Sequence, residues 1–247
     1  MVNTSSNLFA IIQKIQLNLR EIYFNQTMTK CIAIDTSTKR LCLGVKNSSD
    51  YFDLSIEQST DHAKEIFKRI DDVLKLASVS LKELDFLAVG IGPGRFSGLR
   101  VSISAIKSIS YVLDIPIVAI SSLEFIGREM MEQNNKEKVI LIEDAGRENL
   151  YIGSYALKDQ EFINLSDDRV AHIDEIDISQ TDALVAGSGL MRYPDIKIDS
   201  KSLLRQSGEE YLNSKTMIDH ALEQFDKGNT IECMNLKPNY LFDEVAN

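Results

Sequence analysis

The sequence of 247 residues has no tryptophan, three cysteines and four prolines, and it contains no apolar run near the ~20 residues that a membrane span needs. Cys31, Cys42 and Cys233 are odd in number and form no CxxC pair, so we expect no disulfide framework and a cytoplasmic location. Acidic residues outnumber basic ones, which gives a formal net charge of −10. Because phosphate contacts require Lys and Arg, this charge disfavours direct binding of nucleic acid.

The first 27 residues have an unusual pattern. Their apolar side chains recur at helical spacing, at Leu8, Ile11, Ile12, Ile15, Leu19 and Ile22. The pattern predicts an amphipathic helix that docks on the domain, on a partner or on a membrane surface. Lys14 and Arg20 lie inside the apolar zone, which is not the order of a secretory signal. An alternative is that Met28 is the natural start; we expect an appendage to the domain.

The central stretch of the chain runs from Phe86 to Leu113. An apolar run, 86–91, predicts a buried strand, the Gly92-Pro93-Gly94 turn ends it, and apolar residues at helical spacing follow up to Leu113. Small residues on that helix, Ala105 among them, permit close helix packing. The turn could bind an anion at the helix N-terminus, or it could only reverse the chain. We favour the purely structural turn because the loop matches neither common phosphate-binding pattern.

The rest of the chain predicts a repeated strand pattern. Strands 30–35, 41–46 and 51–56 read as an antiparallel meander, a helix follows over 61–77, and strand 115–120 and a short helix from Ser122 come after the central stretch. After a polar break at 134–137, strands 139–144 and 150–153 restart the pattern. Further strands are expected at 161–165, 169–172 and 183–186, and a helix at 209–227. Asp35, Leu41 and Gly44 have the same spacing as Asp144, Leu150 and Gly153, which indicates an internal duplication.

The segment Gly90-x-Gly92-Pro93-Gly94-x-Phe96-x-Gly98-Leu99-Arg100 resembles the GxGPGSFTGLR signature of the TsaB (YeaZ) family, with Arg95 and Ser97 departing from it. The ending Pro238-x-Tyr240-Leu241 resembles the family's P-x-Y-L-R, with Phe242 in place of Arg. The resemblance covers about 28–242. It implies an α/β fold of two actin-like ATPase (ribonuclease H-like) halves, each a mixed sheet with a three-strand antiparallel meander and flanking helices. We expect the extension at 1–27, the first half at 28–133 and the second at 134–247.

In catalytic members of that superfamily, glycine-rich loops let backbone amides approach phosphates closely. Here the corresponding loops have few glycines, so we interpret them as a vestigial nucleotide site formed by Asp35, Thr36, Ser37, Asp144 and Gly146. The two aspartates could hold a metal-bound water or cap their own turns. A small-molecule kinase or ATPase is therefore the rival function.

The related catalytic protein TsaD carries an H-x-E-x-H metal motif, and two histidines at i and i+4 are needed for that site. This chain has His62 near the matching place, but Ile66 stands four residues later, so no metal site of that kind is expected. No G-x-S-x-G motif supports the further alternative, a peptidase acting on TsaD.

The resemblance implies a non-catalytic partner that activates TsaD, together with the ATPase TsaE, for threonylcarbamoylation of tRNA adenosine. We expect no cofactor for the chain alone, and ATP binding only within the complex. Contact with tRNA would be indirect, through the complex. A homodimer could form when the partner is absent. The family's interface maps to the helices predicted at 61–77 and 97–113. The expected partner-binding residues are His62, Phe67, Ile70, Arg95, Phe96, Arg100, Ala105 and Lys107. We expect Ala105→Glu to break the complex without unfolding the chain.

Overall fold

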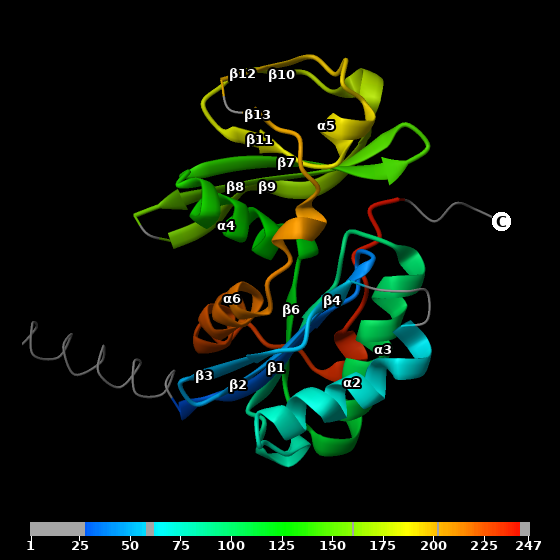
Figure 1. The fold of residues 1–247 in the computed structure, drawn as a ribbon, viewed down its shortest axis with the longest axis vertical. Helices are drawn as coiled ribbons and strands as arrows, with labels where there is room; N and C mark the ends of the chain where they lie inside the picture. The colour runs from blue at the N-terminus through cyan, green and yellow to red at the C-terminus, as the bar shows by residue number, and fades with distance from the viewer. Residues whose placement is uncertain (1–27, 58–61, 160, 202, 243–247) are drawn as a thin grey trace, which may run out of the picture.

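The computed structural model describes residues 28–57, 62–159, 161–201 and 203–242 (Figure 1). The helix expected within 1–27 and the helix cap expected at Asp61 lie outside these ranges. Two mixed sheets lie one above the other, with the helices α4 (Ser122–Asn134) and α6 (Ser214–Asp226) between them (Figure 1).

The first sheet has the strand order β3-β2-β1-β5-β6, and β4 pairs with β2. Its strands are β1 (Lys30–Asp35), β2 (Arg40–Asn47), β3 (Asp50–Asp53), β4 (Ile56–Glu57), β5 (Phe86–Gly90) and β6 (Ile117–Ile120). The strands β1, β2 and β3 form the antiparallel meander, and β5 and β6 extend it in parallel. The apolar run in β1 and β5 is explained by burial on both faces of the sheet.

The second sheet repeats this topology. Its order is β9-β8-β7-β11-β13 when read from the meander, with β7, β8 and β9 antiparallel and β11 and β13 parallel. The strands are β7 (Lys138–Gly146), β8 (Asn149–Lys158), β9 (Glu161–His172), β11 (Leu184–Ala186) and β13 (Leu203–Leu204), with a separate parallel pair, β10 (Ile178–Thr181) and β12 (Ile198–Ser200). The predicted two-half fold class and the duplication of the meander are confirmed.

The helices differ in size between the halves. The first half has α2 (His62–Leu76) and α3 (Phe96–Leu113), whereas the second has the four-residue helix α5 (Gly189–Arg192). Short 3-10 turns complete the described elements: η1 (Leu81–Glu83), η2 (Ile173–Glu175), η3 (Gly208–Tyr211) and η4 (Cys233–Asn235). Among the described helices, none is long and apolar enough to cross a membrane.

Three expected elements differ from those observed. The strand expected at 51–56 is divided into β3 and β4, with residues 54 and 55 between them. Segments 161–165 and 169–172 form one strand, β9, which bulges opposite Gly153; Asp168 in that bulge accepts hydrogen bonds from Ser121 and Tyr155. The last helix begins at Ser214 instead of Glu209, because the side chain of Asn213 caps it by accepting from the amides of residues 215 and 216.

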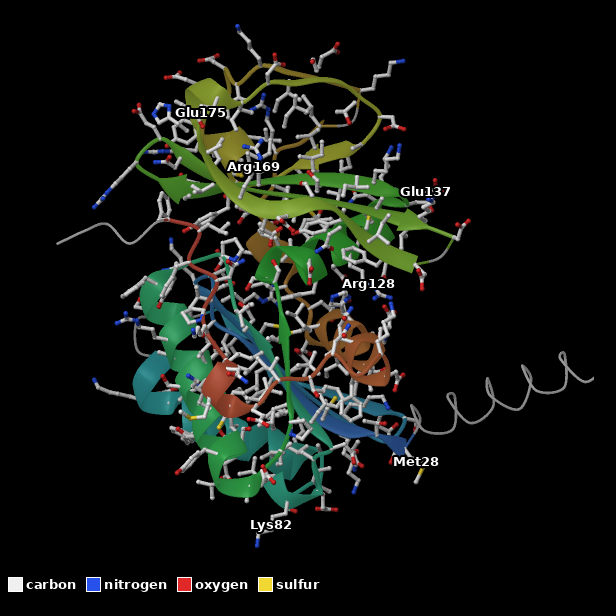
Figure 2. All side chains as sticks on the ribbon, turned by 180° about the vertical axis from the view of Figure 1, so that it is seen from behind. Met28, Lys82, Arg128, Glu137, Arg169 and Glu175 are labelled. Atoms are coloured by element: carbon white, nitrogen blue, oxygen red, sulfur yellow. The ribbon has the colours of Figure 1, made fainter. Side chains whose placement is uncertain are left out.

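Each half of the fold has a helix that packs on the sheet of the other half. The helix α4, which follows the last strand of the first sheet, packs on β7 and β8, and α6, which follows the last strand of the second sheet, packs on β1 and β2. A shared apolar core includes Phe86, Phe125 and Tyr155. Arg128 of α4 lies at this junction (Figure 2) and pairs with Glu223 of α6 at 2.7 Å. The boundary at 133/134 stays a prediction, and α6 belongs by packing to the first sheet.

Candidate functional site

The Gly92-Pro93-Gly94 loop, between β5 and α3, packs directly on the turn that follows β1. The amide of Arg95 donates to the carbonyl of Ser37 at 2.7 Å. A Cβ atom on Gly94 would lie 2.5 Å from that carbonyl oxygen, and one on Gly98 would lie 1.9 Å from the carbonyl oxygen of Thr36. Both distances are too short for a side chain, so these signature glycines permit two backbone segments to touch.

Asp35, at the end of β1, is completely buried. Its carboxylate accepts hydrogen bonds from the Ser37 amide (2.8 Å), the Ser37 hydroxyl (2.6 Å) and the Ser122 hydroxyl (2.5 Å). A Cβ on Gly90 would lie 1.7 Å from its Oδ2. Burial raises the pKa of this carboxyl above its usual value of 3.8. Asp35 therefore joins β1, α4 and its own turn, and does not line the cleft described below.

Thr36 and Ser37 are buried as well. The Thr36 hydroxyl donates to the carbonyl of Gly98 at 2.7 Å and accepts from the amide of Ser102 at 3.3 Å. The first half of the predicted nucleotide site is thus engaged in hydrogen bonds within the protein. Of its three residues, only Ser37 lines the cleft.

The second loop is more open. Asp144 is exposed and its Oδ1 accepts from the Gly146 amide at 2.9 Å, so it caps its own turn. Gly146 has φ +76°, a conformation that favours glycine. Next to it, Glu143 accepts from the amide and hydroxyl of Ser188 and, at 2.7 Å, from the amide of Gly208. Burial raises the pKa of Glu143. The sequence analysis did not single out Glu143, although it follows the apolar run that leads to Asp144.

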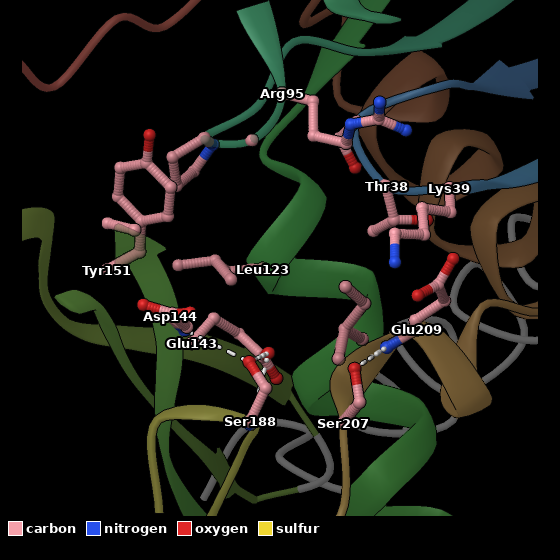
Figure 3. Close-up of a pocket in the computed structure, with 15 residues that line it drawn as sticks. Thr38, Lys39, Arg95, Leu123, Glu143, Asp144, Tyr151, Ser188, Ser207 and Glu209 are labelled. Carbon is pink, nitrogen blue, oxygen red and sulfur yellow. Dashed lines mark hydrogen bonds between the residues drawn. The ribbon is translucent and has the colours of Figure 1, made fainter. Parts of the chain in front are cut away.

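A cleft of about 240 Å³ lies between these loops (Figure 3). Lys39 and Arg95 lie on its first-half wall, whereas Glu143, Asp144 and Glu209 lie on the opposite wall. The remaining lining residues are Ser37, Thr38, Pro93, Gly94, Leu123, Ile126, Ala145, Tyr151, Ser188 and Ser207. Of the five predicted nucleotide-site residues, the structure brings Ser37 and Asp144 together here. The lining thus combines two cationic side chains with three carboxyl groups, so its charge does not single out an anionic ligand.

A second, apolar hollow of about 590 Å³ lies between α2 and α3; we call it the α2/α3 groove. It is lined by Phe67, Ile70, Asp71, Leu74, Lys75, Val79, Ser80, Leu81, Ser108, Ile109, Val112 and Leu113. Phe67 is 56% exposed and Val112 76% exposed. Large apolar side chains exposed together mark an interaction surface. The sequence pattern singled out Phe67 and Ile70, but it missed Val112.

The other expected partner-binding residues are distributed differently. Ala105 is 1% exposed and belongs to the core beneath the groove, so a glutamate there would bury a charge. This corrects the expectation that Ala105→Glu would spare the fold. Ile70 is also buried and forms part of the groove floor. Lys107 is half-buried on α3, and His62 begins α2, with a side chain outside the described part of the chain.

Arg95, Phe96 and Arg100 are exposed at the N-terminus of α3, and the C-terminal tail packs there. Tyr240 stacks on Phe96 with ring centroids 5.0 Å apart, and the guanidinium of Arg100 lies 3.8 Å from the Phe96 ring centroid. Arg100 also donates from Nε to the Tyr240 hydroxyl at 3.1 Å. Phe242, which replaces the family's arginine, packs edge-on against Tyr151 of β8. The tail therefore connects α3 to the second half.

Two histidines have side chains that the structure describes, and both lie near carboxyl groups. His220 lies 3.4 Å from Glu124 and 3.5 Å from Arg128. His172 accepts from the amide of Asp174 at Nδ1 and lies 3.7 Å from Glu148 at Nε2. Within the described ranges, no group of three or more His, Cys, Asp or Glu side chains is arranged to hold a metal ion.

Comparison with known proteins identifies relatives of this chain. A family model described as "TsaD: tRNA N6-adenosine threonylcarbamoyltransferase" matches residues 56–199, more than half of the chain. The Escherichia coli (strain K12) protein named "tRNA threonylcarbamoyladenosine biosynthesis protein TsaB" is 24% identical over 225 residues, covering 88% of this chain and 96% of that protein. The chain belongs to this family, as a TsaB/YeaZ member. The resemblance seen in the sequence is confirmed.

Other TsaB relatives match over shorter lengths. The TsaB protein of Buchnera aphidicola subsp. Schizaphis graminum is 32% identical over 124 residues, which cover 50% of this chain and 59% of that protein. The solved structure described as "YeaZ from Pseudomonas aeruginosa" superimposes with a TM-score of 0.76 at 24% identity, covering 87% of this chain and all of that one. This likeness shows that the YeaZ fold is shared.

Proposed function

We propose that this TsaB/YeaZ chain is a non-catalytic partner subunit in tRNA threonylcarbamoyladenosine biosynthesis, which binds and activates TsaD through the α2/α3 groove. The observation that carries this proposal is the exposed apolar groove itself, in a chain whose full-length relatives are named for this pathway. Burying Phe67 and Val112 against a partner removes apolar surface from water, which is the main driving force for association.

The chemistry of the cleft supports a non-catalytic role. A nucleotide-hydrolysing loop needs backbone amides open to phosphate, whereas here the turn after β1 is buried under Gly94 and Gly98. Asp35, which could have held a metal-bound water or capped its own turn, is buried and accepts three hydrogen bonds from Ser37 and Ser122. A kinase or ATPase would need these contacts to break. In the proposal, ATP is handled with TsaE in the complex, and this acidic chain contacts tRNA only through its partners.

The proposal is tested by mixing the chain with TsaD from the same organism and following complex formation by size exclusion, with and without TsaE and ATP. Val112→Glu places a charge in the groove at a position that is already exposed, so the fold should persist. We expect this change to weaken binding at least about thirtyfold, as for a central interface residue. Met191→Glu, on α5 of the second half and 57% exposed, is the matched control.

Wild-type association that Val112→Glu abolishes and Met191→Glu leaves intact supports the proposal. Absence of any complex under all conditions refutes it. Tight ATP binding by the isolated chain, measured by calorimetry, would instead favour the kinase or ATPase function.

A further inference from the structure

The cleft between the two halves holds charged side chains of both signs that do not pair with one another. Lys39 and Arg95 line it from the first half, and Asp144 and Glu209 line it from the second (Figure 3). Within the part of the chain that the structure describes, none of these four side chains forms an ion pair. Opposite charges that face a cleft without pairing attract a ligand that supplies their missing partners.

The hydroxyl groups of the cleft are largely engaged within the protein. Those of Ser37, Thr38 and Ser188 each donate their one hydrogen to a protein acceptor. The hydroxyl of Ser207 accepts from the amide of Glu209 at 3.2 Å. Recognition of a ligand therefore falls mainly to the charged side chains, which disfavours a sugar or another uncharged polyol.

The charges that remain available to a ligand balance. Glu143 already accepts hydrogen bonds from Ser188 and from the amide of Gly208, so the cleft offers two cationic and two anionic side chains. A nucleotide would place its phosphates near the two available carboxylates, and a polyamine would place ammonium groups near the two basic side chains. A ligand with one anionic and one cationic group matches both walls.

The cleft is small and partly apolar. Its volume of about 240 Å³ lies below the range of roughly 300–1,000 Å³ that is typical of sites for drug-sized ligands. Leu123 and Ile126 of α4, each 2% exposed, line it together with Ala145. These apolar side chains suit a short zwitterion that itself carries an apolar side chain.

We propose that the cleft binds a free α-amino acid with an apolar side chain. Its carboxylate lies against Arg95 and Lys39, because a guanidinium group matches a carboxylate with two parallel hydrogen bonds. Its ammonium group donates to Glu209 and Asp144, and its side chain packs towards Leu123. This site goes beyond the proposed function, since it lies between the two halves and uses no residue of the α2/α3 groove.

The test titrates the full chain with glycine, L-alanine, L-valine and L-leucine by isothermal calorimetry and follows its melting temperature. We expect affinity to rise along this series by about fourfold for each methylene that is buried. Isopentylamine lacks the carboxylate of leucine, and 4-methylpentanoate lacks its ammonium group. Each should bind at least about tenfold more weakly than leucine, because one charge-assisted set of hydrogen bonds is lost.

Two variants each neutralise one wall of the cleft. Arg95→Gln and Glu209→Gln should each weaken leucine binding at least about tenfold. Arg95→Gln should leave the residual binding of isopentylamine unchanged, and Glu209→Gln should leave that of 4-methylpentanoate unchanged, a pattern that a change in the fold would not produce. Glu175→Gln, at an exposed position outside the cleft lining, is the control and should bind leucine as the wild type does (Figure 2). Circular dichroism establishes that all four chains are folded.

Neither saturable heat nor a shift in melting temperature with any of the four amino acids up to about 20 mM overturns the proposal. So does equal binding of leucine and its two analogues, because the opposed charges then hold nothing. A loss with Glu175→Gln as large as that with Glu209→Gln also overturns it. No partner protein enters this test, so it fails separately from the proposed function.

Discussion

Gly98→Ala tests the packing of the signature loop on the first turn. A Cβ at this position would lie 1.9 Å from the carbonyl oxygen of Thr36, so the start of α3 must move away from β1. That movement overpacks the site, at about 1–3 kcal/mol, and stretches the 2.7 Å bond from Thr36 to the Gly98 carbonyl, at about 1 kcal/mol more. We therefore expect a loss of roughly 2–4 kcal/mol of unfolding free energy, or a melting temperature lower by roughly 5–15 °C.

The assay is urea unfolding followed by circular dichroism, with the melting temperature measured separately. Ser97→Ala is the matched control, because Ser97 is exposed and adjacent in the same helical turn. We expect the control to stay within about 0.5 kcal/mol of the wild type. A Gly98→Ala chain as stable as this control would refute the reasoning that the signature glycines are required for backbone contact.

Three further changes probe other parts of the structure. Burial raises the pKa of Asp35 in the folded chain, so its contribution to stability is greatest below its usual pKa of 3.8 and is lost as pH rises through the raised value. Asp35→Asn should remove this contribution, so the difference between the wild-type and variant urea midpoints should change between acidic and neutral pH. A difference that stays constant with pH would contradict this reasoning. Tyr240→Ala should lower the free energy of unfolding by about 1–2 kcal/mol, because it removes both the ring stack on Phe96 and the acceptor for Arg100. Tyr240→Phe keeps the ring stack and should lower it by about 0.5–1 kcal/mol. Equal losses for the two variants in urea unfolding would argue against the stack. Ala105→Glu should unfold the chain or shift its melting temperature down strongly, since it buries a charge in a fully apolar site; a folded variant by circular dichroism would show that the site can open.

The architecture could be predicted because its signals are local. Two meanders separated by a polar break have matched spacings, from Asp35 to Gly44 and from Asp144 to Gly153, and the structure pairs both sets in the same topology. The strand–turn–helix around Gly92 was predictable for the same reason. The start of α6 was placed too early because the cap that decides it is Asn213, and one capping side chain is a weaker signal than a long apolar pattern.

The sites depended on contacts that spacing does not record. Asp35 is satisfied by Ser122, 87 positions away, so its burial could not be read from its own turn. Helical periodicity placed Ala105 on a face of small residues, but it could not say whether that face contacts the core or the solvent; the structure buries Ala105 and leaves Val112 on the surface. The contact of Phe242 with Tyr151 joins the two halves and likewise has no local signal.

The central claim is that this chain supports catalysis by TsaD without performing it. The most direct measurement reconstitutes threonylcarbamoylation of tRNA from TsaD, TsaE, ATP, an activated threonylcarbamoyl donor and this chain, and quantifies the modified adenosine by mass spectrometry. We predict no product from this chain without TsaD, full product with the wild-type chain or Met191→Glu, and loss of product with Val112→Glu that is recovered at high concentrations of that variant. Equal product with and without this chain, or product from this chain in the absence of TsaD, would contradict the account.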